Sequence, residues 1–435
     1  MKKYIIPAIY AVLPDRKEPE LCDILINTET FLIEKIGKSL FREKDTGYLD
    51  EFEGMTVFPG FIDPHVHFRT PGKTDAEDWL HASRAALSAG VTTVLDMPNN
   101  NPPVIDETSY LNKKKIIFNE SLVNFGLFAA MTSANLSELK KIKTIKGIKV
   151  YMASTTGDIL MEDISKIAEP GDFLFAFHAE DEPIIRENEN NFKGEFTPLA
   201  HTKIRSEEAA LKAVKRVIDL QKKTGGNFHI CHVSTAGELE LLKETSISHE
   251  VCAHHLFADT NNYETGRFLW KCNPPLREFE TRKKLLDRLF NEEIQMTATD
   301  HAPHLLPEKL KTDGIPPSGV PSLEAASHLI LTELFKGRIN YHYAAKILSS
   351  NAAQKFDIKS RGQIKEGYFA DLAVVKKENW IFSKNDVYSK CGWSPFEGFE
   401  FEGKVTAAFV NGTLYKRESL KTLKTKDKTA KIYEV

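Results

Sequence analysis

The sequence predicts an α/β protein: a (β/α)8 TIM barrel with a small β-sandwich domain built from both chain termini. Two observations lead to this prediction. Apolar runs rich in Val, Ile, Phe and Ala alternate with longer stretches of helical period across about 250 residues. The segments before and after this region are instead short, glycine-punctuated and β-prone. A doubly wound open sheet stays an alternative, because counting repeats does not distinguish it from a barrel.

The predicted barrel strands are short runs of nearly continuous apolar character, which is typical of parallel strands buried on both faces. They are Thr56–Ile62, Val91–Met97, Leu122–Met131, Gly147–Met152, Phe173–Phe177, Asn227–Val233, Ile247–His254 and Gln295–Thr299. Between them, Glu77–Ala89 and Arg205–Lys223 carry apolar residues at helical spacing. Gly90 follows the first of these helices, at the position where a C-terminal cap belongs.

The terminal segments have a different texture from the barrel region. After the helical stretch Tyr341–Ser350, the runs Ala373–Val375, Val405–Val410 and Gly412–Tyr415 are β-prone and separated by glycines. We therefore expect residues 1–55 and 357–435 to pair into one small β domain, and residues 56–356 to form the barrel.

Composition excludes several classes of protein. The chain has 435 residues, and 58 Lys and Arg against 61 Asp and Glu give a formal net charge of -3, so it lacks the excess of basic residues that nucleic-acid binding needs. No apolar run reaches the length of a membrane span, and the first residues do not resemble a signal peptide. The five cysteines are scattered without a Cys-x-x-Cys pair, which is typical of reduced thiols. We expect a cytoplasmic protein that acts on a small molecule, without nucleic-acid or membrane partners.

Polar residues end several predicted strands, which is where a β/α barrel carries its chemistry. His65 and His67 are two residues apart, so an extended backbone places both imidazoles on one face. Each polar residue alone could be a satisfied buried group, but several unpaired buried groups would cost several kcal/mol each. A shared metal centre would satisfy them together. The candidate ligands are His65, His67, Lys149, His178, His232 and Asp300.

Imidazole and carboxylate ligands suit zinc, manganese, iron or cobalt, and zinc is the default ion. The ligands outnumber those of a single catalytic zinc, which indicates two divalent ions with an anionic bridge between them. An ammonium group on Lys149 would be repelled by such a pair. We therefore expect carbon dioxide to convert Lys149 to an N6-carboxylated lysine, whose two oxygens bridge the ions.

The motifs resemble those of the cyclic amidohydrolases in the amidohydrolase superfamily. Pro59–His67 is similar to the hallmark of these enzymes, and the positions of Lys149, His178, His232 and Asp300 match their metal ligands. Gly367–Ala373 resembles the signature of their small β domain. The resemblance covers essentially the whole chain and implies a metal-dependent hydrolase of cyclic amides.

Within this group, Arg69 in His-x-His-Phe-Arg favours the dihydroorotases, in which this arginine binds the substrate carboxylate. The resemblance implies that the substrate-binding residues are Arg69, Asn99, Asn273, His304 and Gly319. Hydantoinases, dihydropyrimidinases and allantoinases stay alternatives, and a metal-free scaffold relative is a remote one. Many dihydroorotases of this length carry an aspartate where this chain has Lys149, so the bridged pair of ions depends on this lysine.

The resemblance implies reversible interconversion of N-carbamoyl-L-aspartate and (S)-dihydroorotate plus water, a step of pyrimidine biosynthesis. In the hydrolytic direction, metal-activated hydroxide would attack the ring amide, with Asp300 as both ligand and general base. Ser154–Gly157, within residues 153–161, is loosely similar to a substrate-closing loop. Relatives commonly form dimers or tetramers, so we also expect a homo-oligomer.

Overall fold

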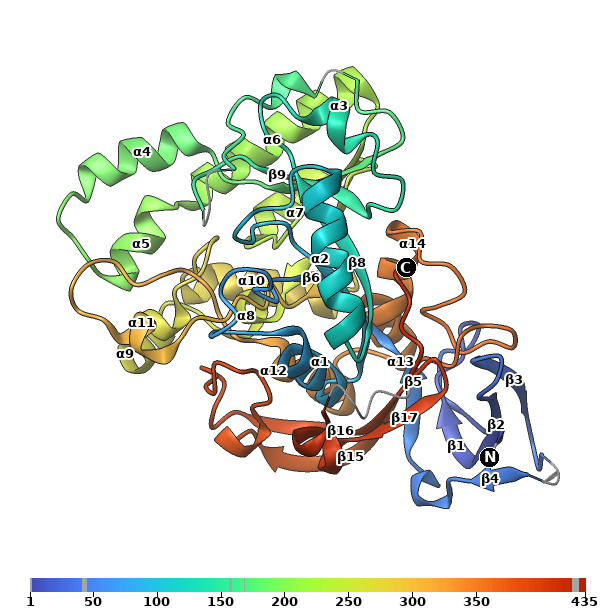
Figure 1. The fold of residues 1–435 in the computed structure, drawn as a ribbon. Helices are drawn as coiled ribbons and strands as arrows, with labels where there is room; N and C mark the ends of the chain where they lie inside the picture. Colours follow the sequence, from blue (N-terminus) through green and yellow to red (C-terminus); the bar gives the residue numbers. More distant parts are fainter. Residues whose placement is uncertain (1, 41–44, 156–158, 168, 425–429) are drawn as a thin grey trace.

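The fold comes from a computed structural model that describes residues 2–40, 45–155, 159–167, 169–424 and 430–435. A parallel β structure surrounded by helices occupies the middle of the molecule, and a mixed sheet flanks it (Figure 1). Strands from both ends of the chain belong to that one mixed sheet.

The parallel strands close into a barrel. Seven of them form one sheet in the order β12-β11-β10-β9-β8-β7-β6, and β13 pairs in parallel with β14. β13 begins two residues after β12 ends, and β14 leads to His301, which pairs in parallel with Val66 of β6. The backbone N–H of His67 also donates to the carbonyl of His301 at 2.9 Å. The strands are β6 (Phe61–Val66), β7 (Val91–Asp96), β8 (Asn124–Ala130), β9 (Gly147–Tyr151), β10 (Leu174–His178), β11 (Asn227–Ile230), β12 (Ser248–His249), β13 (Val251–Cys252) and β14 (Thr297–Ala298).

Closed packing explains why these segments are strands. Every residue of β6, β7, β8, β9 and β10 is buried, as expected for parallel strands covered by side chains inside the barrel and by helices outside it. The predicted barrel is therefore confirmed, and the open doubly wound sheet is not what the chain forms.

Two predicted strands are divided in the structure. Ile247–His254 is split at Glu250 into β12 and β13. Thr56–Ile62 is split at Gly60: β5 (Thr56–Pro59) belongs to the mixed sheet, and only β6 belongs to the barrel. A Cβ atom at Gly60 would lie 2.3 Å from Oγ1 of Thr92, so the glycine lets the chain pass closely from one sheet to the other.

Helices follow most barrel strands, and several of them begin at a side-chain cap. Asp78 accepts the N–H of His81 at the start of α1, and Ser206 accepts the N–H of Ala209 at the start of α6. The helices are α1 (Trp79–Ser88), α2 (Glu107–Glu120), α3 (Leu136–Leu139), α4 (Glu182–Asn191), α5 (Pro198–Ile204), α6 (Glu207–Thr224), α7 (Ala236–Leu242), α8 (Ala253–Phe257), α9 (Asn262–Gly266), α10 (Phe279–Phe290), α11 (Leu306–Leu310), α12 (Leu323–Phe335), α13 (Tyr341–Ala345) and α14 (Asn351–Lys355). In the described residues, no helix combines the length and apolar character that crossing a membrane would need.

The two ends of the chain build one sheet, as predicted. Its order is β17-β16-β15-β5-β1-β2-β3, and β4 pairs with β1. The strands are β1 (Lys3–Ala11), β2 (Glu20–Asn27), β3 (Leu32–Gly37), β4 (Thr46–Tyr48), β5, β15 (Leu372–Ile381), β16 (Glu400–Val410) and β17 (Thr413–Lys416). β5 lies between N-terminal β1 and C-terminal β15, and its chain continues directly into barrel strand β6.

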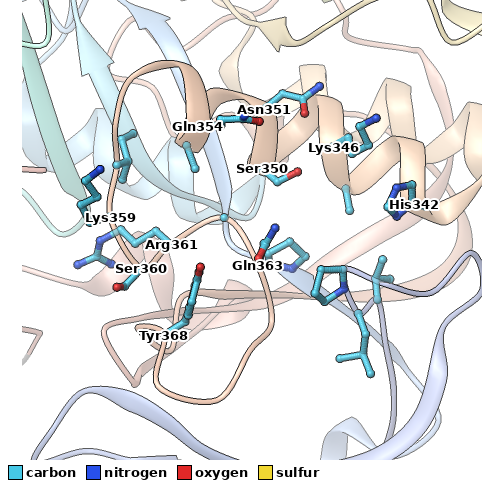
Figure 2. A pocket seen from close by; sticks show the side chains of 18 of the residues that line it. His342, Lys346, Ser350, Asn351, Gln354, Lys359, Ser360, Arg361, Gln363 and Tyr368 are labelled. Carbon is cyan, nitrogen blue, oxygen red and sulfur yellow. The ribbon is translucent and has the colours of Figure 1, made fainter.

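A broad cavity lies where the mixed sheet meets the barrel, beside Pro59 at the end of β5 (Figure 2). Its polar lining includes Ser350, Gln363 and Tyr368. Two of its cationic side chains are engaged in ion pairs, Lys359 with Asp357 and Arg361 with Asp371. The cavity is at the amino-terminal end of the strands, opposite the end at which barrel enzymes carry their chemistry.

Candidate active site

A second cavity lies at the carboxyl ends of the barrel strands and gathers the predicted residues. It is lined by His65, His67, Arg69, Asn99, Lys149, Tyr151, Thr155, His178, His232, Asn273, Asp300, Ala302, Ser318 and Gly319. His304 is not in this lining, but its Nε2 atom lies 3.2 Å from Nη2 of Arg69. The predicted closing segment 153–161 is described only in part, because residues 156–158 lie outside the described chain.

His65, His67 and Asp300 form the closest set of candidate ligands. Their donor atoms lie within 4.8 Å of one another. Oδ1 of Asp300 is 3.0 Å from Nε2 of His67 and 3.4 Å from Nε2 of His65. Strand β6 carries the first histidine, and Asp300 follows β14, so barrel closure between these strands brings the three together.

His178 and His232 form a second pair beside the first set. Nδ1 of His178 lies 2.9 Å from Nε2 of His232, and the rings of His65 and His232 have centroids 5.3 Å apart. Nδ1 of His232 is buried and has no hydrogen-bond partner among the described residues. A buried imidazole nitrogen without a hydrogen-bond partner is energetically unfavourable. A bound ion nearby would change which ring nitrogen of each histidine forms hydrogen bonds and which one faces the ion.

Lys149 points into the barrel from the middle of β9 and is fully buried. Its Nζ atom donates to Sγ of Cys231 at 2.7 Å. The lysine and the histidines thus line one cavity, although they come from β9, β10 and β6 and from the segments that follow β6 and β11.

Burial sets the protonation of these groups. Burial lowers the pKa of His65 to about 4 and also lowers that of His178 and His232, so the three imidazoles are neutral at pH 7. Burial alone would raise the pKa of Asp300, but His65 and His67 hold it well below its usual range. Neutral imidazoles and an ionised carboxylate are the forms that bind a divalent metal.

Two buried carboxylates behind the histidines were not predicted. Oε1 of Glu250 lies 2.5 Å from Nδ1 of His65, and Oε2 of Glu250 lies 3.0 Å from Nε2 of His229. Oε2 of Glu180 lies 2.8 Å from Nε2 of His178. An acidic residue inside the apolar run Ile247–His254 was the available signal for Glu250, since such a residue must be paired when buried.

Arg69 occupies the other side of the cavity and is only 7% exposed. Its Nε atom donates to the carbonyl of Pro303 at 3.0 Å, and its Nη2 atom lies 3.2 Å from His304. Among the described residues it forms no ion pair with a carboxylate. A buried guanidinium without a counter-charge is costly, and it faces a cavity in which an anionic ligand could supply that charge.

The other predicted substrate residues are held by contacts within the chain. Oδ1 of Asn99 lies 2.6 Å from Nδ1 of His67, and Oδ1 of Asn273 lies 2.9 Å from Nε2 of His201. Gly319 has a φ of 147°, and a Cβ atom there would lie 2.3 Å from the carbonyl of Ala302. Its own N–H donates to the carbonyl of Lys271 at 2.8 Å. These contacts fix the two amides and the glycine loop at the cavity wall.

Three of the predicted residues have a left-handed backbone: φ is 58° at Arg69, 38° at His232 and 46° at Asp300. This conformation is unfavourable for residues with a side chain and is concentrated at functional sites in proteins. The barrel therefore maintains local strain at the positions that direct these side chains into the cavity.

Comparisons with known proteins agree with this geometry. The model of the amidohydrolase family matches residues 56–415. A dihydroorotase of Methanosphaera stadtmanae is 33% identical over 402 residues, which cover 90% of this chain and 92% of the relative. A dihydroorotase of Methanosarcina acetivorans is 34% identical over 400 residues, which cover 87% and 85%.

Solved structures with a similar fold include an L-hydantoinase (dihydropyrimidinase) from Arthrobacter aurescens, with a TM-score of 0.88, 24% identity and coverage of 95% of this chain and 96% of that one. A dihydropyrimidinase from Brevibacillus agri has a TM-score of 0.86, 22% identity and coverage of 95% and 94%. At these identities the likeness shows the fold. Because the family model spans most of the sequence, and the relatives align over nearly their full length, the chain is an enzyme that belongs to the amidohydrolase family.

Proposed function

We propose that this enzyme is a dihydroorotase, which interconverts N-carbamoyl-L-aspartate and (S)-dihydroorotate plus water. The observation that carries the proposal is the buried Arg69 guanidinium, which has no carboxylate partner in the described part of the chain and lines the same cavity as the candidate metal ligands. Dihydroorotate has a carboxylate that a guanidinium can bind through two hydrogen bonds, whereas hydantoins and dihydropyrimidines without one leave this charge unpaired. The dihydroorotase relatives support the same choice.

The donor set fits two divalent ions, and we assign zinc as the default. His65, His67, Lys149, His178, His232 and Asp300 would hold them, with Lys149 as the bridge. In the bridging form, carbon dioxide has formed a bond to Nζ with loss of a proton, which leaves a carbamate with two oxygens. When bound, such ions polarise an amide carbonyl and acidify water.

The residues of the chain position the substrate and move the proton. Arg69 binds the substrate carboxylate, and His304 supports its guanidinium. Asn99 and Asn273 hold the ring at the cavity wall, which makes attack on the ring amide effectively unimolecular.

Asp300 has the geometry of the general base, because its ionised carboxylate lies beside His65 and His67 at the centre of the candidate ligands. In ring opening, the water oxygen bonds to the amide carbon and its proton passes to Asp300. The carbon–nitrogen bond then breaks, and Asp300 returns the proton to the leaving nitrogen. Ring closure is the reverse.

The substitution Arg69→Met tests the assignment. We expect kcat/KM for dihydroorotate to fall by at least about 100-fold, since a bidentate charged contact is lost, while metal content stays that of the wild type. Arg338→Met, at an exposed arginine paired with Glu333, is the matched control and should retain activity. Unchanged turnover in Arg69→Met would refute the role of this arginine.

Turnover of dihydroorotate, hydantoin, a dihydropyrimidine and allantoin should be compared on the same preparation, before and after chelation. We expect dihydroorotate to be preferred and chelation to abolish its turnover. Preference for hydantoin or allantoin would support the alternative amidohydrolases, and full activity without metal would contradict the metal centre. A homo-oligomer in the cytoplasm is our further proposal for its state in the cell.

A further inference from the structure

Tyr151 presents a polar group to the active-site cavity that the proposed chemistry has not used. Its side chain is 2% exposed, and its hydroxyl is buried without a hydrogen-bond partner among the described residues. Buried tyrosine hydroxyls are normally hydrogen-bonded, because an unmade bond leaves the cost of desolvation uncompensated. A molecule bound in the cavity could therefore supply the hydrogen-bond partner that this hydroxyl lacks within the described chain.

Packing holds the ring of Tyr151 in this position. The ring belongs to a small apolar cluster with Ala130 and Ile159. Its backbone is fixed as well, since the carbonyl of Tyr151 accepts the N–H of Met161 at 2.7 Å. A side chain held on its apolar flank presents its polar end in one direction, so little conformational entropy is lost when that end binds a ligand.

The position of Tyr151 on β9 places it next to the reacting centre. Tyr151 and Lys149 are two residues apart on one strand, so they point to the same side, into the barrel. Nζ of Lys149 lies 5.5 Å from the centre of the Tyr151 ring, and the rings of Tyr151 and His178 have centroids 6.2 Å apart. Tyr151 is thus one step nearer the mouth of the barrel than the proposed bridging lysine.

The order of the strands separates Tyr151 from the residues that would bind the carboxylate. Arg69 follows β6 and His304 follows β14, and these strands are neighbours. β9 lies three strands away from β6 around the barrel. Arg69 and Tyr151 line the same cavity, so a ring whose carboxylate is bound by Arg69 would have room to extend towards Tyr151 with its amide end.

We propose that the phenolic O–H of Tyr151 donates a hydrogen bond to the oxygen of the amide carbonyl that is hydrolysed. This inference rests on the proposed function. As water adds to the carbonyl carbon, negative charge develops on this oxygen, and the hydrogen bond from Tyr151 strengthens. The contact therefore stabilises the transition state more than the bound substrate, which makes Tyr151 a catalytic residue.

The test is Tyr151→Phe, which removes the hydroxyl and keeps the ring that packs on Ala130 and Ile159. Steady-state kinetics of dihydroorotate hydrolysis should show kcat lower by about 100-fold, as for loss of a single oxyanion donor, with KM changed by less than about threefold. Thermal stability and metal content should equal those of the wild type.

Tyr343→Phe is the matched control. Tyr343 is equally buried, but its hydroxyl already donates to the carbonyl of Ile294 at 2.9 Å, away from the cavity. This variant should keep wild-type kcat and KM. That result would show that losing a buried phenolic hydroxyl does not by itself lower kcat.

Two results would overturn the inference. Unchanged kcat in Tyr151→Phe would show that the hydroxyl does not assist the reaction. A raised KM with unchanged kcat would show that it holds a part of the ring that does not react. Failure of the proposed function is a separate outcome, because wild-type enzyme would then not turn over dihydroorotate. The same comparison of kcat is then made with whichever of the other cyclic amides the wild type hydrolyses.

Discussion

Glu250 shows how one buried residue can organise several others. Its carboxylate contacts ring nitrogens of both His65 and His229, and it accepts the backbone N–H of His232 at 3.3 Å. Burial alone would raise the pKa of Glu250, but the two neighbouring imidazoles lower it below its usual range. An ionised Glu250 fixes Nδ1 of His65 as its hydrogen-bond donor and leaves Nε2 as the nitrogen that faces Asp300.

At the same scale, Glu250→Gln should weaken metal binding by about 10- to 100-fold, since the carboxylate that orients His65 is lost. The measurement is metal content after dialysis against increasing chelator concentrations. Glu280→Gln, at an exposed position on α10, is the control. Equal metal retention in Glu250→Gln and the wild type would show that Glu250 is only a structural partner of His229.

The location of a side chain in the cavity could be predicted where it depends on the position of the residue along a strand. His65, His67, Lys149 and His178 lie on barrel strands or directly after them, and the cavity includes all four. Their common location follows from strand alternation and from the shared rim of parallel strands, both of which can be read from sequence. His201 was missed, since it reaches Asn273 from α5, a separate helix. The catalytic and ligand roles themselves stay predictions.

At the scale of elements, helix ends were predictable but their packing was not. Gly90 was predicted as a cap and follows α1 with a φ of 77°, and Gly225 caps α6 with a φ of 66°. The two sites differ in their surroundings. A Cβ atom at Gly225 would contact no atom of the described residues within 4 Å, whereas one at Gly90 would lie 2.8 Å from Cβ of Ala373 in β15 and 3.0 Å from the ring of Phe61 in β6.

We therefore expect Gly225→Ala to lower the free energy of unfolding by about 1 kcal/mol, the cost of a left-handed backbone with a side chain. Gly90→Ala should cost about 1–3 kcal/mol more, because the added methyl group also overpacks the junction between barrel and mixed sheet. Urea unfolding of both variants measures the difference. Equal costs would mean that the junction relaxes around the methyl group.

At the scale of the whole molecule, many histidines are buried and uncharged. Burial lowers the pKa of His328 to about 3, and lowers those of His249 to about 3 and His301 to about 4. Each accepts a backbone N–H at a ring nitrogen, for example His328 Nε2 from Val405 at 3.2 Å. Protonation would abolish these bonds, so the folded protein takes up protons less readily than the unfolded chain.

Acid lowers the stability that these buried histidines confer. Histidine in the unfolded chain has a pKa of about 6.5, so between that pH and the lower folded values the unfolded state binds more protons. Above about pH 6.5 the buried histidines therefore make their whole contribution to the free energy of unfolding. This contribution falls as the pH drops, by up to about 1.4 kcal/mol per pH unit for each such histidine.

His328→Gln should make this slope shallower by about one proton's contribution. Urea unfolding of wild type and variant at a series of pH values between 7 and 4.5 checks it, and the comparison cancels the carboxylates common to both. An unchanged slope would show that His328 does not contribute to the loss of stability in acid.

The division of the chain at residues 55/56 and 356/357 stays a prediction. The structure shows why such a boundary is hard to place from sequence. β5 pairs with β1 and β15 in the mixed sheet, yet only Gly60 separates it from β6 of the barrel. Hydrophobic patterning indicates that a segment is a buried strand. It does not indicate which strands pair with it, because these partners come from both ends of the chain.

The sequence by itself determined the alternation of strands and helices, the ends at which polar side chains gather, and the identity of the candidate ligands and of Arg69. The alternation, the polar strand ends and the candidate ligands follow from local periodicity and from the geometry common to all parallel barrels, whereas Arg69 was identified through the resemblance of its motif to the dihydroorotases. Only the tertiary structure decided how β14 meets β6 and which carboxylates support the histidines. It also decided that, among the described residues, Arg69 has no carboxylate partner and the Tyr151 hydroxyl has no hydrogen-bond partner. Those features arise from contacts between residues far apart in the chain, and no local pattern encodes which distant atoms will meet.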